Sequence, residues 1–273
     1  MIHLNGRLVD AATARIDPAD RGLLLADGLF ETLRAYGGKP FALEAHLSRL
    51  AQGAAALGIP TPAVADLTEA VAETLAANKL PEASLRITLT RGSGPRGLLP
   101  PDNPTPTVLV SASPAGAPPS AWRARIVPVR RNEHSPLSRL KTLAYLDNVL
   151  ALRQAAATGA DEALMLNTAG RLASGSRSNL FLVLSGVLVT PPESEGVLPG
   201  IARRTVLALA AEAGIATREA PLSAEDLELA AEAFVSNSVV EVVPLVVVDD
   251  NTLPPGPVAA LLARRYAELA RSA

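Results

Sequence analysis

The stretch Ser113-Pro114-Ala115-Gly116-Ala117-Pro118-Pro119-Ser120-Ala121 divides the chain into two parts that can each form a lobe. It holds three prolines and one glycine among small residues, a composition typical of an exposed connection between domains. We therefore predict an N-terminal lobe of residues 1–112, a linker of residues 113–121 and a C-terminal lobe of residues 122–273.

Both predicted lobes mix helix and strand patterns. Segments with apolar residues at helical spacing follow runs in which every second residue is apolar. No βαβ unit recurs and no internal repeat is found, so we predict a mixed α and β class, α+β. In the first lobe we predict a hairpin over 2–16, strands over 24–35, 85–91 and 107–112, and helices over 43–57 and 62–77. In the second lobe we predict strands over 123–129, 162–167, 179–184, 233–236 and 239–248, and helices over 143–157, 201–213 and 257–271.

The composition excludes several classes of protein. Of 273 residues, 48% are hydrophobic and 19% are charged, which indicates a packed core rather than a disordered chain. A net charge of −2 without a basic patch argues against a nucleic-acid partner. The lack of cysteine excludes disulfides and thiolate chemistry, and His3, His46 and His134 are too scattered for a metal site.

The sequence shows no membrane or export signal. No apolar run reaches the roughly 18 residues that a membrane helix needs. The first ten residues alternate in polarity and lack the apolar core of a signal peptide. We therefore expect a cytoplasmic protein with no membrane partner.

Lysine is rare in this chain. Of 25 lysines and arginines, only three are lysines: Lys39, Lys79 and Lys141. Because arginine cannot carry out amine chemistry, a lysine in a structured segment is a candidate nucleophile. Lys39 lies in a predicted hairpin turn, and Lys79 follows a predicted helix, where a cation suits the helix dipole. Lys141 has no such explanation.

Three local patterns each allow two interpretations. Lys141, flanked by Leu140 and Leu143, could be an exposed lysine or a partly buried nucleophile. Gly200-Ile201-Ala202 opens a predicted helix and could bind an anion through backbone amides or serve as an ordinary helix entry. Ser236-Asn237-Ser238 interrupts an apolar strand and could contact a phosphate or form a turn.

Seven stretches, taken together and in order, resemble the class IV aminotransferase family, the fold-type-IV pyridoxal-phosphate enzymes. The stretches are 20–32 (DRGLLLADGLFET), 46–50 (HLSRL), 90–97 (TRGSGPRG), 138–151 (SRLKTLAYLDNVLA), 160–164 (ADEAL), 175–181 (GSRSNLF) and 198–201 (LPGI). The resemblance implies a two-lobed enzyme with pyridoxal 5′-phosphate in the cleft between the lobes. It also implies a homodimer that acts on a small-molecule substrate.

The resemblance implies which residues hold the cofactor. Lys141 matches the lysine that forms the Schiff base and moves the substrate proton. Four positions match phosphate ligands: Arg49, the backbone amides of Ile201 and Ala202, and the Ser238 hydroxyl. The family usually has threonine where Ala202 stands, so one hydroxyl contact is lost there.

Further positions match residues near the cofactor ring or the substrate. Tyr145 is similar to a tyrosine beside the ring, with half-buried packing as the alternative. The substrate positions are Phe30, Arg96 and Arg177, and Arg96 would bind a carboxylate or be an exposed loop arginine. The alternative for the phosphate ligand Arg49 is an ion pair with Glu44 or Glu69.

This chain departs from the family pattern at three places. Leu25-Ala26-Asp27-Gly28 replaces Tyr-Gly-Asp-Gly, and Ala144 replaces the asparagine before Tyr145. Ser174 stands where the family has a glutamate paired with the pyridine nitrogen. A hydroxyl can hydrogen-bond that nitrogen but cannot supply the negative charge that keeps it protonated. Glu162 is not an obvious substitute, because the family has both acids.

Three functions follow from the resemblance. The favoured one is a lyase that splits 4-amino-4-deoxychorismate into 4-aminobenzoate and pyruvate, on the basis of Phe30-Glu31-Thr32, the 91–97 loop and Asn237-Ser238. The alternative is a D-amino-acid or R-amine transaminase, although Leu98 replaces a histidine of the D-amino-acid branch. The branched-chain branch, with its Phe-Glu-Gly pattern, fits less well. The third is a cofactor-binding protein with weak catalysis, as Ser174 implies.

Overall fold

A computed structural model describes residues 1–272, which group into two units. The division after Gly116 lies within the segment 113–121 that the sequence predicts as a linker. Two helix-bearing sheets make up the fold, so the predicted α+β class is confirmed. The first unit contains Met1–Gly116 and Leu140–Ala144, and the second contains Ala117–Arg139 and Tyr145–Ser272.

One short segment leaves the second unit and packs on the first. The sequence predicts Lys141 in the C-terminal lobe, but Leu140–Ala144 groups with the first unit. Backbone pairing is the physical reason, because Thr142 forms an antiparallel bridge with Leu29. The helix predicted over 143–157 therefore begins later, as α4 (Leu146–Ala156).

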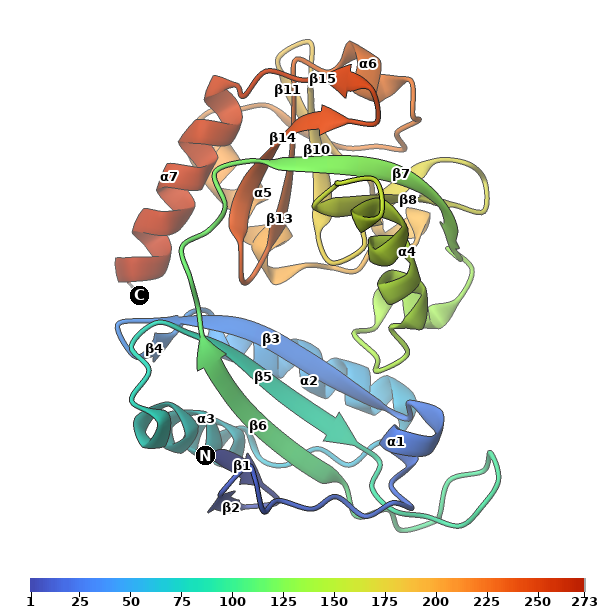
Figure 1. Cartoon of the computed structure of the whole chain (residues 1–273), viewed down its shortest axis with the longest axis vertical. Coiled ribbons are helices and arrows are strands. Elements are labelled where there is room, and N and C mark those ends of the chain that lie inside the picture. Colours follow the sequence, from blue (N-terminus) through green and yellow to red (C-terminus); the bar gives the residue numbers. More distant parts are fainter. Residues whose placement is uncertain (273) are drawn as a thin grey trace. The chain divides into compact units, whose positions relative to one another are not determined.

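The first unit is built on a six-stranded antiparallel sheet with the strand order β2-β1-β6-β5-β3-β4 (Figure 1). The predicted alternation holds in its centre, where Leu85, Ile87 and Leu89 of β5 are buried on one face. The strands are β1 (Ile2–Leu4), β2 (Arg7–Val9), β3 (Gly28–Tyr36), β4 (Lys39–Pro40), β5 (Ala83–Thr90) and β6 (Thr107–Pro114).

Helices α2 (Leu43–Leu57) and α3 (Val64–Asn78) cover one face of this sheet (Figure 1). The helix α2 has the bounds that its apolar spacing predicts, and it ends at Gly58 with a φ of 64°. Leu47, Leu50 and Leu67 pack with the strands in the core of this unit. The opposite face of the sheet is left to other side chains.

A short helix, α1 (Arg21–Leu25), replaces the beginning of the strand predicted over 24–35. The Asp20 carboxylate accepts a hydrogen bond from a first-turn amide and starts the helix. Ala26, with a φ of 54°, ends it. The strand β3 therefore begins only at Gly28.

The second unit contains a nine-stranded mixed sheet in the order β12-β11-β10-β13-β14-β7-β8-β9, with β15 beside β14. The sheet curls around an apolar interior in which Trp122, Leu182 and Val243 are buried together. The strands are β7 (Trp122–Arg131), β8 (Glu162–Asn167), β9 (Leu172–Gly175), β10 (Asn179–Leu184), β11 (Val187–Thr190), β12 (Thr217–Glu219), β13 (Glu232–Asn237), β14 (Glu241–Val248) and β15 (Asn251–Thr252).

Helices pack against this curled sheet. The helix α4 packs on β7 and β8, α5 (Ile201–Glu212) packs on β13, and α7 (Pro257–Ser272) packs on β14 and α5. The shorter helices are α6 (Asp226–Leu229) and the 3₁₀ turns η1 (Pro136–Arg139) and η2 (Glu193–Glu195). Within residues 1–272, no helix has the length and apolar character to cross a bilayer.

Candidate active site

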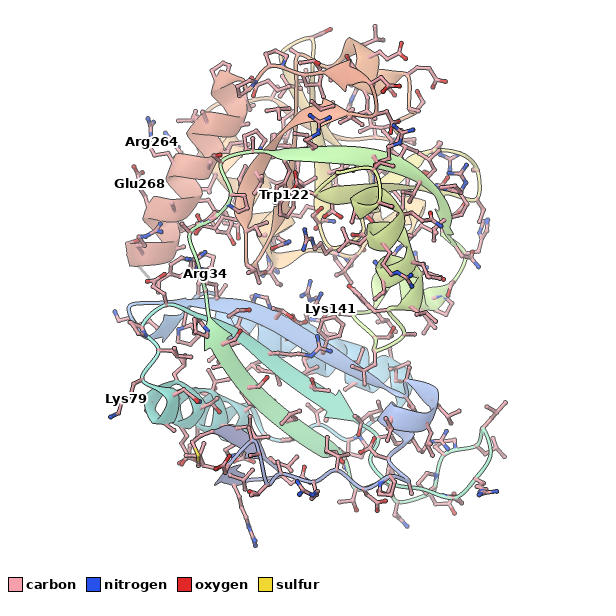
Figure 2. All side chains as sticks on the ribbon, in the orientation of Figure 1. Arg34, Lys79, Trp122, Lys141, Arg264 and Glu268 are labelled. Atoms are coloured by element: carbon pink, nitrogen blue, oxygen red, sulfur yellow. The ribbon has the colours of Figure 1, made fainter. Side chains whose placement is uncertain are left out.

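Lys141 lies in an extended segment that pairs with the start of β3 (Figure 2). The Phe30 amide donates to the Lys141 carbonyl, and the Leu143 amide donates to the Gly28 carbonyl, each at 2.9 Å. Gly28 permits this approach, because a β-carbon there would lie 2.5 Å from the Leu89 carbonyl oxygen. The pairing holds Lys141 at a defined point on the first unit.

The Lys141 amine contacts the ring of Phe30, with Nζ 4.4 Å from the ring centroid. The Arg86 guanidinium lies over the same ring, with Cζ 3.8 Å from the centroid. Both contacts are favourable cation–π interactions. The structure thus brings together Lys141 and Phe30, which the sequence singles out, and Arg86, which sequence reasoning missed.

Arg86 and Arg34 lie on the sheet face opposite the helices. Alternation along β3 places Phe30, Thr32 and Arg34 on this face, and Thr32 pairs directly with Arg86 of β5. The Arg34 guanidinium forms an ion pair with Glu82 at 3.2 Å. The alternating pattern over 85–91 could have indicated which way Arg86 points, but not that this face carries Lys141.

Arg49 forms a two-point ion pair with Glu31, so the suggested pairing with Glu44 or Glu69 is wrong. Its Nε and a terminal nitrogen lie 2.8 and 2.6 Å from the two carboxylate oxygens. The Nδ1 atom of His46, one helical turn earlier on α2, lies 2.7 Å from the same carboxylate. Glu31 reaches α2 from β3, and this geometry fixes the orientation of the Arg49 guanidinium.

Burial lowers the pKa of His46 below its ordinary 6.5, and the charges of Arg49 and Lys141 act in the same direction against the hydrogen bond with Glu31. Burial by itself would raise the pKa of Glu31, but hydrogen bonds from His46 and Arg49 hold it below 4.5. At neutral pH the cluster therefore holds a neutral imidazole, a carboxylate and a guanidinium. The influence of Lys141 on His46 places the amine in the same electrostatic environment.

Arg96, which the family resemblance places at a substrate carboxylate, is exposed on the loop 92–106. Among the residues described, it has neither an ion pair nor a hydrogen bond. Two neighbouring arginines are anchored instead, since Asp27 accepts hydrogen bonds from Arg21 at 2.9 Å and Arg91 at 2.8 Å. Arg21 also donates to the carbonyl oxygens of Gly97, Leu98 and Leu99. This bonding ties the loop to α1.

The N-terminus of α5, in the second unit, carries the predicted phosphate amides of Ile201 and Ala202. No side chain caps this end, so first-turn amides are available to an anion. A β-carbon at Gly200 would collide with Asn179, which pairs with Ser236 across the sheet. Within residues 1–272, the buried Ser236 hydroxyl has no hydrogen-bond partner. An uncapped helix and an unsatisfied hydroxyl suit a phosphate group.

Ser238 lies in the turn between β13 and β14 and is partly exposed. Asn237 shapes this turn, because its Oδ1 atom accepts hydrogen bonds from the amides of Val239 and Val240 at 2.8 and 2.9 Å. This turn also explains why β14 begins at Glu241 and not at 239, as the sequence predicts.

Ser174 is buried in β9 and pairs with Met165 of β8. The nearby acid Glu162 is fully buried, and its carboxylate accepts hydrogen bonds from the amide and hydroxyl of Ser176 and from the hydroxyl of Ser178. These bonds commit Glu162 to the loop after β9. They agree with the expectation that Glu162 does not substitute for an acid at position 174.

Arg177 and Tyr145 belong to the second unit. The Arg177 guanidinium lies 4.7 Å from the ring centroid of Trp122 and donates to the Asp161 carbonyl at 2.8 Å. Its side chain is therefore engaged with the protein. Tyr145 is half-buried directly before α4.

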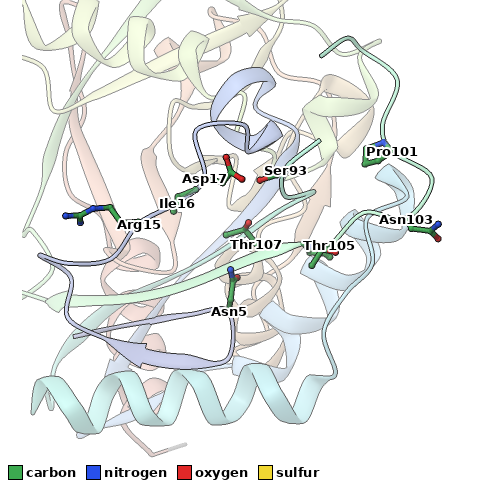
Figure 3. Close-up of a pocket in the computed structure, with 10 residues that line it drawn as sticks. Asn5, Arg15, Ile16, Asp17, Ser93, Pro101, Asn103, Thr105 and Thr107 are labelled. Atoms are coloured by element: carbon green, nitrogen blue, oxygen red, sulfur yellow. The ribbon is translucent and has the colours of Figure 1, made fainter. Parts of the chain in front are cut away.

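A separate pocket of about 380 Å³ lies in the first unit (Figure 3). None of the predicted site residues lines it. Its polar lining includes Asn5, Arg15, Asp17, Ser93, Thr105 and Thr107. This pocket is therefore distinct from the surroundings of Lys141.

Comparison with known sequences identifies the family. The model of amino-transferase class IV matches residues 28–248. The chain is 40% identical over 258 residues to a Methanocaldococcus jannaschii protein provisionally assigned as a branched-chain-amino-acid aminotransferase, covering 92% of this chain and 89% of that protein. It is 30% identical over 258 residues to D-alanine aminotransferase of Bacillus licheniformis, covering 93% and 91% of the two chains.

Solved structures agree over nearly the whole chain. A branched-chain aminotransferase from Thermoproteus uzoniensis is 33% identical with a TM-score of 0.94, covering 99% of this chain and 94% of that one. The 4-amino-4-deoxychorismate lyase of Pseudomonas aeruginosa is also 33% identical, with a TM-score of 0.87 and coverage of 100% and 98%. A branched-chain amino acid aminotransferase from T.th., 28% identical with a TM-score of 0.93 and coverage of 99% and 94%, was solved with pyridoxamine 5′-phosphate. Sequence and fold together show that the chain belongs to the class IV aminotransferases, a family of pyridoxal 5′-phosphate enzymes.

Proposed function

We propose that this chain carries pyridoxal 5′-phosphate on Lys141 and transfers the amino group of an amino acid to a 2-oxo acid. The observation that carries the proposal is the shared aromatic neighbour of Lys141 and Arg86, the Phe30 ring. An amine and a guanidinium placed in this way can address the two ends of one small carboxylate-bearing molecule. The relatives named as branched-chain and D-alanine aminotransferases support transamination.

The chain offers ligands that suit the phosphate of the cofactor. Arg49 would bind it from the first unit, in the orientation that Glu31 imposes. The uncapped N-terminus of α5 would bind it from the second unit, together with the Ser238 hydroxyl. Ser174 and Tyr145 would lie at the cofactor ring. When bound, pyridoxal 5′-phosphate supplies an aldehyde for amines and a ring that accepts the electron pair left at the substrate carbon.

Lys141 has two roles in this proposal. Its Nζ atom forms the covalent bond with the cofactor. Once the substrate amine has taken that place, the released amine accepts the proton from the substrate Cα. The backbone pairing with β3 keeps the range of positions of Nζ small, and this favours repeated proton transfer at one carbon.

Arg86 is the residue that we propose for the substrate carboxylate. It lies on the same sheet face as Phe30, and its guanidinium can bind a carboxylate with two parallel hydrogen bonds. Arg34, held by Glu82, adds positive charge to this face. Arg96 and Arg177 stay as proposals from the family resemblance.

A lyase acting on 4-amino-4-deoxychorismate is the second candidate. Thr32 favours it, because its side chain lies on the face of Phe30 and opposite Arg86. A threonine there reduces the room for a branched aliphatic side chain, where the branched-chain pattern has glycine. The solved lyase that is 33% identical over the whole chain supports the same reading.

We further propose a homodimer that buries a leucine face, defined as Leu23, Leu24, Leu25, Leu98 and Leu99. These side chains are 69%, 60%, 45%, 83% and 85% exposed. Arg21 joins the two segments, because it begins α1 and donates to the backbone of residues 97–99. A cluster of exposed leucines is a surface that a second copy can bury.

The proposed function is tested on the protein loaded with pyridoxal 5′-phosphate. Borohydride reduction should attach the cofactor to the peptide that contains Lys141, and attachment at Lys39 or Lys79 would contradict the proposal. The loaded protein is then given D- and L-amino acids with 2-oxo acids, and 4-amino-4-deoxychorismate separately. A new amino acid supports transamination, whereas 4-aminobenzoate with pyruvate supports the lyase. Covalent loading without either product supports the weakly catalytic cofactor binder that Ser174 implies.

A further inference from the structure

Arg131, the last residue of β7, donates to three separate segments of the second unit. Its Nε atom lies 3.0 Å from the Gly196 carbonyl oxygen, and one terminal nitrogen lies 2.9 Å from the Ser138 carbonyl oxygen. The other terminal nitrogen lies 3.5 Å from Oδ1 of Asn148. All three acceptors are uncharged, so the guanidinium acts here by direction rather than by ion pairing.

Two of these bonds fall at the ends of the segment that carries Lys141. The chain leaves the second unit after Arg139, packs with the first unit over Leu140–Ala144, and returns at Tyr145. Ser138 lies directly before this departure, and Asn148 lies shortly after the return. Arg131 therefore closes the base of a short excursion of the backbone.

Both ends of the excursion are tied down further. The Ser138 hydroxyl donates to the Asn132 carbonyl at 2.6 Å, and the Asn148 amide group donates to the Ser176 carbonyl at 2.5 Å. Ser138 and Asn148 are each only 8% exposed. The Arg131 bonds are thus part of a buried network, where an unmade hydrogen bond is costly.

The third bond depends on close packing at Gly196. This residue has a φ of 81°, and a β-carbon there would lie 3.2 Å from Cγ of Arg131 and 3.0 Å from the Glu133 Cα. Gly200, which begins α5, follows four residues later. The same guanidinium therefore also holds the backbone that leads to the proposed phosphate-binding helix end.

We propose that Arg131 is a positioning residue for Lys141: it fixes both ends of the Lys141 segment without touching cofactor or substrate. The inference rests on the proposed function of Lys141. When the guanidinium is removed, the segment should open more often, and the amine should occupy a wider range of positions. Covalent loading and proton transfer should then slow, since both depend on the placement of Nζ.

The test compares Arg131→Ala and Arg131→Lys with Arg130→Ala, a matched control because Arg130 is the adjacent arginine and is exposed. Without cofactor, hydrogen exchange of the amides in Leu140–Ala144 should be about tenfold faster in Arg131→Ala. Arg131→Lys should lie between this variant and wild type, and Arg130→Ala should match wild type. With cofactor, the rate of covalent loading should fall, and the pH dependence of its absorbance should shift in the same order.

The outcomes separate this inference from the proposed function. If borohydride does not label Lys141 in wild type, the proposed function fails and the inference falls with it. If wild type is labelled but both Arg131 variants exchange and load at the wild-type rate, only the inference is wrong. If exchange rises over the whole second unit in both variants, Arg131 serves the folding of that unit and the inference is also wrong.

Discussion

Arg49 on α2 and Glu31 on β3 are joined by two hydrogen bonds of 2.8 and 2.6 Å. Glu31 is 1% exposed, so a buried carboxylate orients the arginine proposed to hold the cofactor phosphate. Orientation of this kind lowers the ordering cost when an anion binds. Lys141 lies in the electrostatic environment of the same cluster, and this connects cofactor binding with the covalent site.

Replacing Arg49 with alanine should weaken the affinity for pyridoxal 5′-phosphate by about tenfold or more, since a lost charge-assisted bond costs about 1.5–3 kcal/mol. Glu31→Gln should have a smaller effect, because the guanidinium remains but is less well oriented. Fluorescence titration of the cofactor-free protein measures both. Arg7→Ala, at an exposed arginine of β2, should leave the affinity unchanged. Equal affinities for Arg49→Ala and wild type would reject the phosphate assignment.

Arg86→Ala should raise the KM for the amino-acid substrate by about tenfold or more, because a charge-assisted bond to its carboxylate is lost. Cofactor affinity should be unchanged. Arg96→Ala is the informative comparison, since it tests the loop arginine that the family resemblance favours. Steady-state kinetics for both variants decide between them: an effect confined to Arg96→Ala would transfer the carboxylate role to the loop.

Ser174→Glu should speed amino-group transfer from the substrate to the cofactor. The added carboxylate would keep the pyridine nitrogen protonated, and a protonated ring accepts the substrate electron pair more readily. Single-turnover reactions with D-alanine and L-alanine, followed by the absorbance of the cofactor, measure this step. Ser174→Ala serves as a control for the loss of the hydroxyl alone. An unchanged rate and spectrum in a folded and loaded Ser174→Glu protein would show that position 174 does not face the nitrogen.

Glu133 should make the stability of the second unit sensitive to acid. A hydrogen bond from its own amide and bonds from Thr168 lower its pKa from 4.5 to about 2. The unfolded chain binds the proton more readily, so this stabilisation is complete above pH 4.5 and is lost as the pH falls toward 2. Glu133→Gln should therefore lower the unfolding temperature at pH 6, and the difference from wild type should shrink in acid. Glu228→Gln, at an exposed acid of α6, should follow wild type at both pH values.

Leu98→Asp combined with Leu24→Asp should disrupt the proposed homodimer, because charges would enter the leucine face. Light scattering coupled to size exclusion should show a dimer for wild type and a monomer for the double variant. Leu229→Asp is a matched control, since Leu229 is 76% exposed but belongs to the second unit. A double variant that keeps the wild-type mass would place the interface elsewhere.

Local patterns are sufficient for several elements. The helix α2 and the strands β8 and β10 have the predicted bounds, because each has a clear apolar period and a clear end. The short strands β9, β11 and β12 are absent from the sequence-based prediction, since segments of four, four and three residues depend on their neighbours for hydrogen bonds. The leucines of α1 fit a strand pattern, because nothing local shows that they point to solvent.

Composition, period and motif are enough to predict the mixed α and β class, the division near Gly116 and the choice of Lys141 among three lysines. These are properties of neighbouring residues, so they can be read along the chain. The meeting of Phe30 and Arg86 at Lys141, and the pairing of Arg49 with Glu31, follow only from the folded arrangement. Strand register and the return of the Lys141 segment to β3 create these contacts. They join residues far apart in the chain, and no local pattern encodes which of them come together.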